Sequence, residues 1–173
     1  MKIEVIINDI TKLDSDVEAI VNAANSSLLG GGGVDGAIHK AAGPLLYEEC
    51  KTLHGCNPGD AKVTKAYRLK QKYIIHTVGP MYYYDDNPSK TLRSCYEKCL
   101  KVADELNVKK IAFPSISTGV YRYPVEEAAM IAMDVFKTYK AKNIECVIMC
   151  VFNKETYDAY LDALNPKHIW HNT

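Results

Sequence analysis

Short apolar runs alternate along the chain with longer segments in which apolar residues recur every three or four positions. The short runs predict strands at residues 3–7, 19–21, 62–67, 72–78, 111–113 and 145–152. The longer segments predict helices at residues 34–49, 89–107, 124–140 and 154–164. Because strands that are apolar on both faces alternate with helices, the pattern predicts an α/β fold in which a sheet lies between helical layers.

Composition fits one globular domain. The chain has 173 residues, 47% hydrophobic and 24% charged, so residues 1–165 can bury a core, and residues 166–173 form a polar tail with no readable role. A formal net charge of zero gives no electrostatic case for nucleic-acid binding. The first apolar run is interrupted by Glu4, and no run approaches membrane length. We therefore expect a cytoplasmic monomer that binds neither nucleic acid nor membrane.

Six cysteines, at positions 50, 56, 95, 99, 146 and 150, raise the alternatives of a metal site or disulfides. None forms a Cys-x-x-Cys pair, the spacing that structural zinc sites favour. The pairs 95/99 and 146/150 each fall on one face of a predicted element, which suits small buried thiols. Free thiols and no metal are expected.

Four consecutive glycines, residues 30–33, lie between an apolar run and the helix predicted to begin near Val34. Glycines cost conformational entropy and leave nothing to pack, so a backbone that curls tightly with its N–H groups exposed is the natural reason to keep them. The N-terminus of the following helix adds partial positive charge. This loop is therefore predicted to hold an anion.

A second loop of small residues, 114–124, joins a predicted strand to a predicted helix in the same way. If the crossovers are right-handed, both loops face the same end of the sheet and form one cleft that suits a diphosphate. The usual nucleotide signatures are weak: a P-loop lysine is missing from the sequence, and Gly31, Gly33 and Gly36 meet Gly-x-Gly-x-x-Gly only because they belong to a glycine-rich stretch.

Four blocks, residues 22–25, 30–39, 76–80 and 114–121, occur in an order that resembles macrodomains, specifically the MacroD-type branch. The resemblance covers residues 3 to about 164. It implies a three-layer α/β/α sandwich with a mixed central sheet and a cleft for ADP-ribose. It also implies hydrolysis of ADP-ribose esterified to acidic side chains of proteins, without metal or cofactor, and related enzymes deacetylate O-acetyl-ADP-ribose.

The resemblance assigns roles to particular residues. Asp9 matches an aspartate that accepts a hydrogen bond from the adenine amine, and Ile10 follows it in the adenine pocket. Phe152 matches an aromatic residue that lies against the base, although residues of its type also form strand cores. The ligand-binding residues implied for the two loops are Gly32, Gly33, Val34, Ser115, Ser117, Thr118, Gly119, Val120 and Tyr121.

Asn25 and Asp35 match the pair beside the distal ribose, at the bond to be cleaved, although an Asx turn and a helix N-cap would explain them without the resemblance. The helix N-terminus is expected to lower the pKa of Asp35 and so make it a weak general base. We therefore expect Asp35 to orient a ribose hydroxyl or a water while Asn25 fixes the ribose, so that positioning supplies most of the rate.

Two other function classes stay open. A reader module would bind ADP-ribose on partner proteins without cleaving it, and a nucleotide phosphatase is disfavoured because the sequence lacks a cluster of metal ligands. His76 is expected to be a satisfied core residue, and His39 to support the glycine loop. Arg122 and the tyrosines at 82–84 receive no role.

Overall fold

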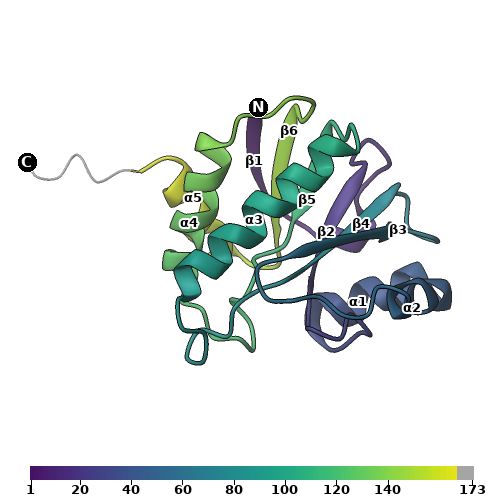
Figure 1. Cartoon of the computed structure of the whole chain (residues 1–173). Coiled ribbons are helices and arrows are strands. Elements are labelled where there is room, and N and C mark those ends of the chain that lie inside the picture. Colours follow the sequence, from purple (N-terminus) through teal and green to yellow (C-terminus); the bar gives the residue numbers. More distant parts are fainter. Residues whose placement is uncertain (167–173) are drawn as a thin grey trace, which may run out of the picture.

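The computed structural model describes residues 1–166 and shows a six-stranded sheet covered by helices (Figure 1). The strands are β1 Lys2–Ile7, β2 Ala19–Ala24, β3 Ala61–Lys65, β4 Tyr73–Val78, β5 Lys110–Phe113 and β6 Cys146–Val151. The helices are α1 Gly33–Ala42, α2 Pro44–Lys51, α3 Pro88–Glu105, α4 Val125–Thr138 and α5 Lys154–Leu164, together with a 3-10 helix at Ile10–Lys12. All but one residue of the tail predicted at 166–173 lies outside the described residues.

The sheet is mixed, as predicted. Its strand order is β1-β6-β5-β2-β4-β3, in which every neighbouring pair is parallel except β3 and β4. The carboxyl ends of the five parallel strands consequently lie along one edge of the sheet. Binding sites of open α/β sheets form at this edge.

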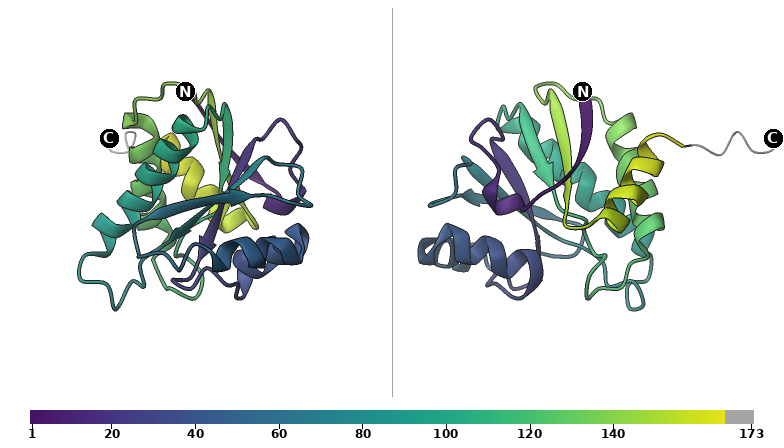
Figure 2. Two further views of the ribbon diagram at one scale, coloured as in Figure 1. Left: turned by 45° about the vertical axis from the view of Figure 1, so that its right-hand side comes forward. Right: turned by 180° about the vertical axis from the view of Figure 1, so that it is seen from behind.

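Alternate residues of each central strand pack into different cores. In β2, Ala19 and Val21 belong to the core under α3, α4 and α5, whereas Ile20 belongs to the core under α1 and α2. The same alternation separates Ile74 from Ile75 in β4. Because successive side chains of a strand point to opposite faces, the sheet is covered on both sides (Figure 2). The predicted three-layer α/β/α sandwich is therefore confirmed.

One predicted helix is two helices in the structure. The helix expected at residues 34–49 breaks at Gly43, whose φ of +89° is closed to most L-residues, and Pro44 starts the second helix. The apolar periodicity continues across the break because Ala42 and Leu46 are both buried against the same core. Periodicity alone therefore could not reveal the turn.

The two predicted binding loops begin at neighbouring strands. β2 leads into the glycine loop, β5 leads into the loop that begins at Pro114, and β2 pairs with β5 in parallel. The prediction that both loops face the same end of the sheet is therefore confirmed. Separately, among residues 1–166 no helix combines the length and apolar character that crossing a membrane requires.

Candidate active site

A cleft of about 560 Å³ opens at the carboxyl edge of the sheet, where segments that follow β2, β4, β5 and β6 meet. Twelve of the fourteen sequence-predicted site residues line it: Asn25, Gly32, Gly33, Val34, Asp35, Ser115, Ser117, Thr118, Gly119, Val120, Tyr121 and Phe152. Residues far apart in the sequence are thus brought together around one hollow. Asp9 and Ile10 do not line it.

Asp9 and Ile10 lie beside the cleft, at the end of β1. The Asp9 carboxylate accepts hydrogen bonds from Thr11 N at 2.9 Å and Thr11 Oγ1 at 2.6 Å, and these bonds lower its pKa. Ile10 is only 2% exposed and packs in the core under α1 and α2. Phe152, in contrast, is 65% exposed at the rim. The interpretation of Phe152 as a strand-core residue is therefore wrong.

The glycine loop presents unused backbone donors to the cleft. The first helical hydrogen bond of α1 runs from Gly36 N to Gly32 O at 3.1 Å. Among residues 1–166, no acceptor is found for the backbone N–H groups of residues 31–35. Since the first N–H groups of a helix lack intrahelical partners, this end of α1 can receive an anion.

The second loop is braced by side chains and also keeps its amides free. Ser115 Oγ lies 2.7 Å from both Thr118 Oγ1 and Tyr160 OH, and Tyr82 N donates to Tyr121 O at 2.9 Å. Within the described part of the chain, the N–H groups of residues 117–121 have no internal acceptor. Two facing sets of free donors suit a group with two linked phosphates.

Ser117 occupies a position that suits a ligand contact. Its φ is +66°, it is 7% exposed, and its buried hydroxyl has no hydrogen-bond partner among the described residues. A Cβ on Gly79, the residue after β4, would collide with this hydroxyl and with the Ile116 side chain, so this position favours glycine. Gly79 lines the cleft although the sequence pointed to it only as the end of a strand.

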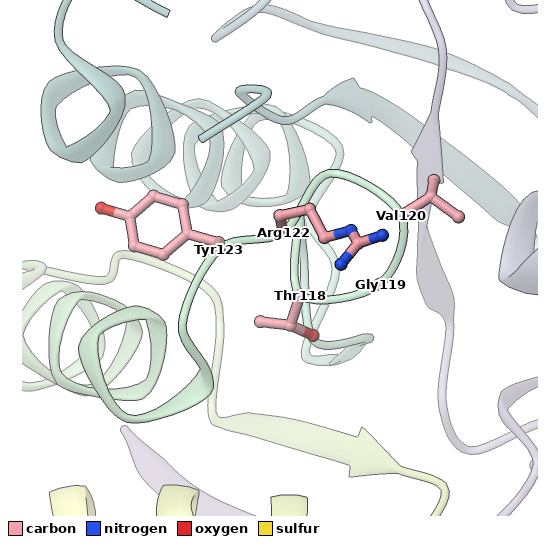
Figure 3. A pocket seen from close by; sticks show the side chains of 5 residues that line it. All are labelled: Thr118, Gly119, Val120, Arg122 and Tyr123. Carbon is pink, nitrogen blue, oxygen red and sulfur yellow. The ribbon is translucent and has the colours of Figure 1, made fainter. Parts of the chain in front are cut away.

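A second hollow lies on the other side of this loop (Figure 3). Its lining comes from one segment: Thr118, Gly119, Val120, Arg122 and Tyr123. The exposed Arg122 side chain lies across the loop toward Val120, Arg122 does not line the cleft, and Arg122 N donates to Gly119 O at 3.0 Å. With one segment for walls, this hollow lacks the convergent polar groups of a small-molecule site.

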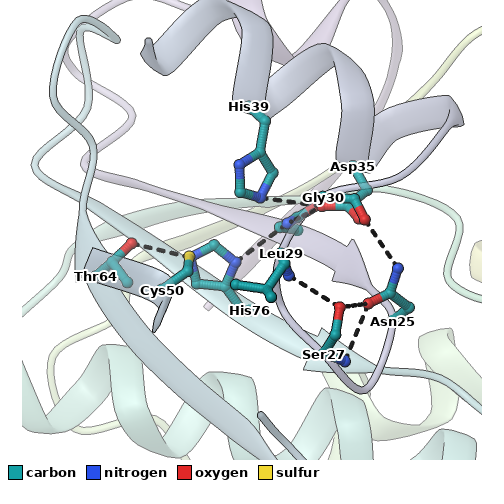
Figure 4. Close-up of polar contacts among 10 residues, drawn as sticks. Asn25, Ser27, Leu29, Gly30, Asp35, His39, Cys50, Thr64 and His76 are labelled. Atoms are coloured by element: carbon teal, nitrogen blue, oxygen red, sulfur yellow. Dashed lines mark hydrogen bonds and ion pairs between the residues drawn. The ribbon is translucent and has the colours of Figure 1, made fainter. Parts of the chain in front are cut away.

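Asn25 and Asp35 converge on Gly31. A Cβ on Gly31 would lie 3.3 Å from Asn25 Nδ2 and 3.2 Å from Asp35 Oδ2. The Asn25 amide donates to Gly30 O at 3.0 Å, and its oxygen accepts from Ser27 N at 3.1 Å and Ser27 Oγ at 2.6 Å (Figure 4). The turn suggested by sequence therefore exists, and it aims the Asn25 amide at the same point as the Asp35 carboxylate.

The expectation that the pKa of Asp35 is lowered is wrong. Asp35 is 4% exposed, and removal of its carboxylate from water raises its pKa. The hydrogen bond from Asn22 and the nearby His39 ring act in the opposite direction without cancelling burial. Among the described residues no backbone N–H donates to this carboxylate. A raised pKa makes Asp35 a better proton acceptor than a surface aspartate.

A buried chain of hydrogen bonds supports Asp35 from behind (Figure 4). Asn22 Nδ2 lies 2.9 Å from Asp35 Oδ1 and 3.1 Å from His76 Nδ1, and His76 Nε2 lies 2.9 Å from Thr64 Oγ1. Since an amide nitrogen only donates, His76 Nδ1 accepts and Nε2 carries the proton. Burial lowers the pKa of His76 to about 3, which keeps the ring neutral.

The core role expected for His76 is confirmed, since it is fully buried and hydrogen-bonded at both nitrogens. Sequence reasoning missed Asn22 as the link between His76 and Asp35, although a polar residue within an apolar strand was a visible signal. His39 Nε2 lies 3.4 Å from Asp35 Oδ1. Its ring also lies 3.7 Å from the Cβ position of Gly30, consistent with the expected support of the loop.

All six cysteines are free thiols, as expected. Cys150 lines the cleft, and burial raises its pKa to about 11, so it is not a nucleophile at neutral pH. Among residues 1–166, no three His, Cys, Asp or Glu side chains are grouped so that they could hold a metal ion. The polar groups that the cleft offers for catalysis are thus the Asn25 amide, the Asp35 carboxylate and the free backbone N–H groups of the two loops.

Sequence comparison gives close relatives over nearly the whole chain. The chain is 49% identical to O-acetyl-ADP-ribose deacetylase 1 of Pantoea vagans over 95% of its own length and 99% of the relative. It is 47% identical to human ADP-ribose glycohydrolase MACROD2 over 95% of its length, but it spans only 39% of that protein.

Solved structures show the same fold. An Oceanobacillus iheyensis macrodomain with ADP superposes with a TM-score of 0.89 at 39% identity, over 94% of this chain and 89% of that one. A Trypanosoma brucei macrodomain in complex with ADP-ribose gives a TM-score of 0.82 at 39% identity, over 91% and 67% of the two chains. The family model described as Macro domain matches residues 21–132. The chain therefore belongs to the Macro domain family.

Proposed function

We propose that the chain is a hydrolase that binds ADP-ribose in the cleft and releases ADP-ribose esterified to aspartate or glutamate side chains of proteins. The same site would remove the acetyl group of O-acetyl-ADP-ribose, which is also an ester. Relatives named as an ADP-ribose glycohydrolase and an O-acetyl-ADP-ribose deacetylase support this proposal. The observation that carries it is the convergence of the Asn25 amide and the Asp35 carboxylate on Gly31, beside two loops of free amide donors.

In this proposal the two loops bind the diphosphate through backbone N–H groups and place the distal ribose near Gly31. The amide of Asn25, already held in a turn by Ser27, fixes the ribose. Asp35 orients a water and accepts its proton as the ester bond breaks. One water is consumed, and a free carboxylic acid and ADP-ribose are released, so no metal or cofactor enters the balance.

The raised pKa of Asp35 supports its proposed role as the proton acceptor. A carboxylate that is favoured by neither backbone donors nor bulk water gains more from taking up a proton. Asn22 donates to Oδ1 and leaves Oδ2 to face Gly31. The network through His76 therefore fixes one oxygen and presents the other to substrate, which is the pre-organisation that positioning catalysis needs.

The proposal is tested by a time course of ADP-ribose release from a protein modified on glutamate. The purified chain should release ADP-ribose with many turnovers per molecule and without added metal. A reader module would instead bind the modified protein and free ADP-ribose but release nothing. Calorimetry with free ADP-ribose does not separate the two functions, so release is the deciding measurement.

A further inference from the structure

A groove of about 410 Å³ continues outward from the catalytic end of the cleft. Gly31 lines both hollows, so the groove begins beside the point on which Asn25 and Asp35 converge. The groove is bounded by the glycine loop, by α1 and α2, and by the segment after β3. Its outer wall is formed by Leu29, Lys40, Tyr47 and Arg68.

Two cations give this groove a positive charge in a chain whose net charge is zero. Lys40 and Arg68 are exposed, and neither has an ion-pair partner within residues 1–166. No ion pair within the described residues therefore offsets the charge of either side chain.

Arg68 is held over the groove rather than extended into water. Its backbone N–H donates to Ala42 O at 3.2 Å, at the junction of α1 and α2. Its side chain lies across Gly43, where an added Cβ would come within 2.9 Å of Arg68 Nε. A guanidinium placed in advance loses less conformational freedom when it binds a carboxylate.

We propose that this groove binds an acidic segment of the ADP-ribosylated protein next to the modified residue. The proposal rests on the proposed function, because a protein esterified at the distal ribose must leave the cleft beside Asn25 and Asp35. Carboxylates of the segment would pair with Lys40 and Arg68, while the partly exposed Leu29 and Tyr47 offer apolar contacts.

The test uses two peptides that carry ADP-ribose on one glutamate. In the acidic peptide this glutamate is flanked on both sides by Asp and Glu, and in the neutral peptide it is flanked by Ser and Gln. Each is prepared as the ester and with a non-hydrolysable linkage. The protein should bind the acidic non-hydrolysable conjugate more tightly, and Lys40→Gln/Arg68→Gln should remove this preference. At two exposed ion pairs, a loss of about fivefold is expected at low salt, and it should shrink as salt is added.

The control variant Lys101→Gln/Lys140→Gln removes two exposed positive charges, one from α3 and one from the segment after α4. It should keep the preference, and both variants should bind free ADP-ribose and cleave O-acetyl-ADP-ribose as the unmodified protein does. Equal affinity of the protein for the two conjugates, or equal losses of the preference in the two double variants, would overturn the proposal that the groove binds an acidic segment. Absence of ester cleavage alongside an intact preference would instead refute the hydrolase and leave the groove standing.

Discussion

Replacement of the buried His76 by glutamine should change how the stability of the protein depends on pH. The ring is fully buried and neutral, with Nδ1 accepting from Asn22 and Nε2 donating to Thr64. Protonation would place a positive charge in the core. It would also make Nδ1 a hydrogen-bond donor that faces the Asn22 amide, which is itself a donor. A glutamine amide can offer an oxygen to Asn22 and an N–H to Thr64 but takes up no proton in this range.

The size of the effect follows from the two pKa values of His76. Its ordinary pKa is 6.5, and burial lowers it to about 3 in the folded protein. Between these values the unfolded chain binds a proton that the folded chain does not, so the folded state loses stability as pH falls. The difference between the two pKa values corresponds to about 5 kcal/mol of unfolding free energy, which is fully present above pH 6.5 and is lost once the pH has fallen to about 3.

Asp35 acts in the opposite direction over part of this range. Its raised pKa means that the folded chain binds its proton first, so stability falls as pH rises from the ordinary value of 3.8 toward the raised one. A single pH profile of the protein therefore mixes both groups. Comparison with His76→Gln isolates the histidine, because Asp35 is present in both proteins.

Urea unfolding at several pH values between 7 and 4 provides the measurement. The unfolding free energy of the unmodified protein should fall more steeply with acidification than that of His76→Gln, so that the two values converge or cross. His76→Leu, which also cannot titrate, should share the flatter profile whatever its stability at pH 7. Parallel profiles for all three proteins would refute the assignment of a buried neutral histidine.

Four further substitutions test the cleft. Gly31→Ala places a Cβ 3.2 Å from Asp35 Oδ2 without backbone strain. Because a displacement of a reacting group by about 1 Å costs about a hundredfold in rate, this smaller crowding should lower kcat by about tenfold in steady-state kinetics. An unchanged kcat would contradict the convergence on Gly31. Asn22→Leu removes a donor that lowers the pKa of Asp35, so the acid limb of the pH–rate profile should move to higher pH; a fixed limb would exclude Asp35 as the titrating group. Gly79→Ala should lower the free energy of unfolding in urea by about 1–3 kcal/mol, because the added methyl group collides with the Ser117 hydroxyl. Adding Ser117→Ala should restore part of this loss, whereas additive losses would show that the residues at 79 and 117 do not touch.

The layers of the fold and the place of the cleft could be predicted from local patterns. Alternation of strands with helices, and two small-residue loops that each follow a strand, were enough to predict a cleft between these loops at one edge of the sheet. The break at Gly43 could not be seen in the apolar periodicity, although the Gly43-Pro44 pair was a turn signal.

The electrostatics of Asp35 could not be predicted, because they depend on tertiary burial. The sequence showed a carboxylate near a helix N-terminus, which alone would lower its pKa. It did not show that the Asp35 side chain is buried and hydrogen-bonded to Asn22 of β2. For this buried carboxylate, loss of hydration outweighed the hydrogen bond from Asn22 and the nearby His39 ring.

The roles of Asp9 and Ile10 rested on resemblance alone and remain predictions. Asp9 uses Oδ1 to hold Thr11, and no hydrogen bond to its other oxygen is found within residues 1–166. A carboxylate oxygen beside the end of β6 is therefore still open to an adenine amine. Binding of ADP-ribose by Asp9→Asn, compared with binding of ribose phosphate lacking the base, checks the assignment.

The central claim is that Asn25 and Asp35 turn binding of ADP-ribose into hydrolysis. The direct measurement is the rate of ADP-ribose release from a glutamate-modified protein by Asp35→Asn and Asn25→Ala, alongside their affinity for free ADP-ribose. The account predicts that Asp35→Asn releases ADP-ribose about 10² to 10⁴ times more slowly, with Asn25→Ala also impaired, while both variants still bind ADP-ribose. Full activity in both variants would contradict it.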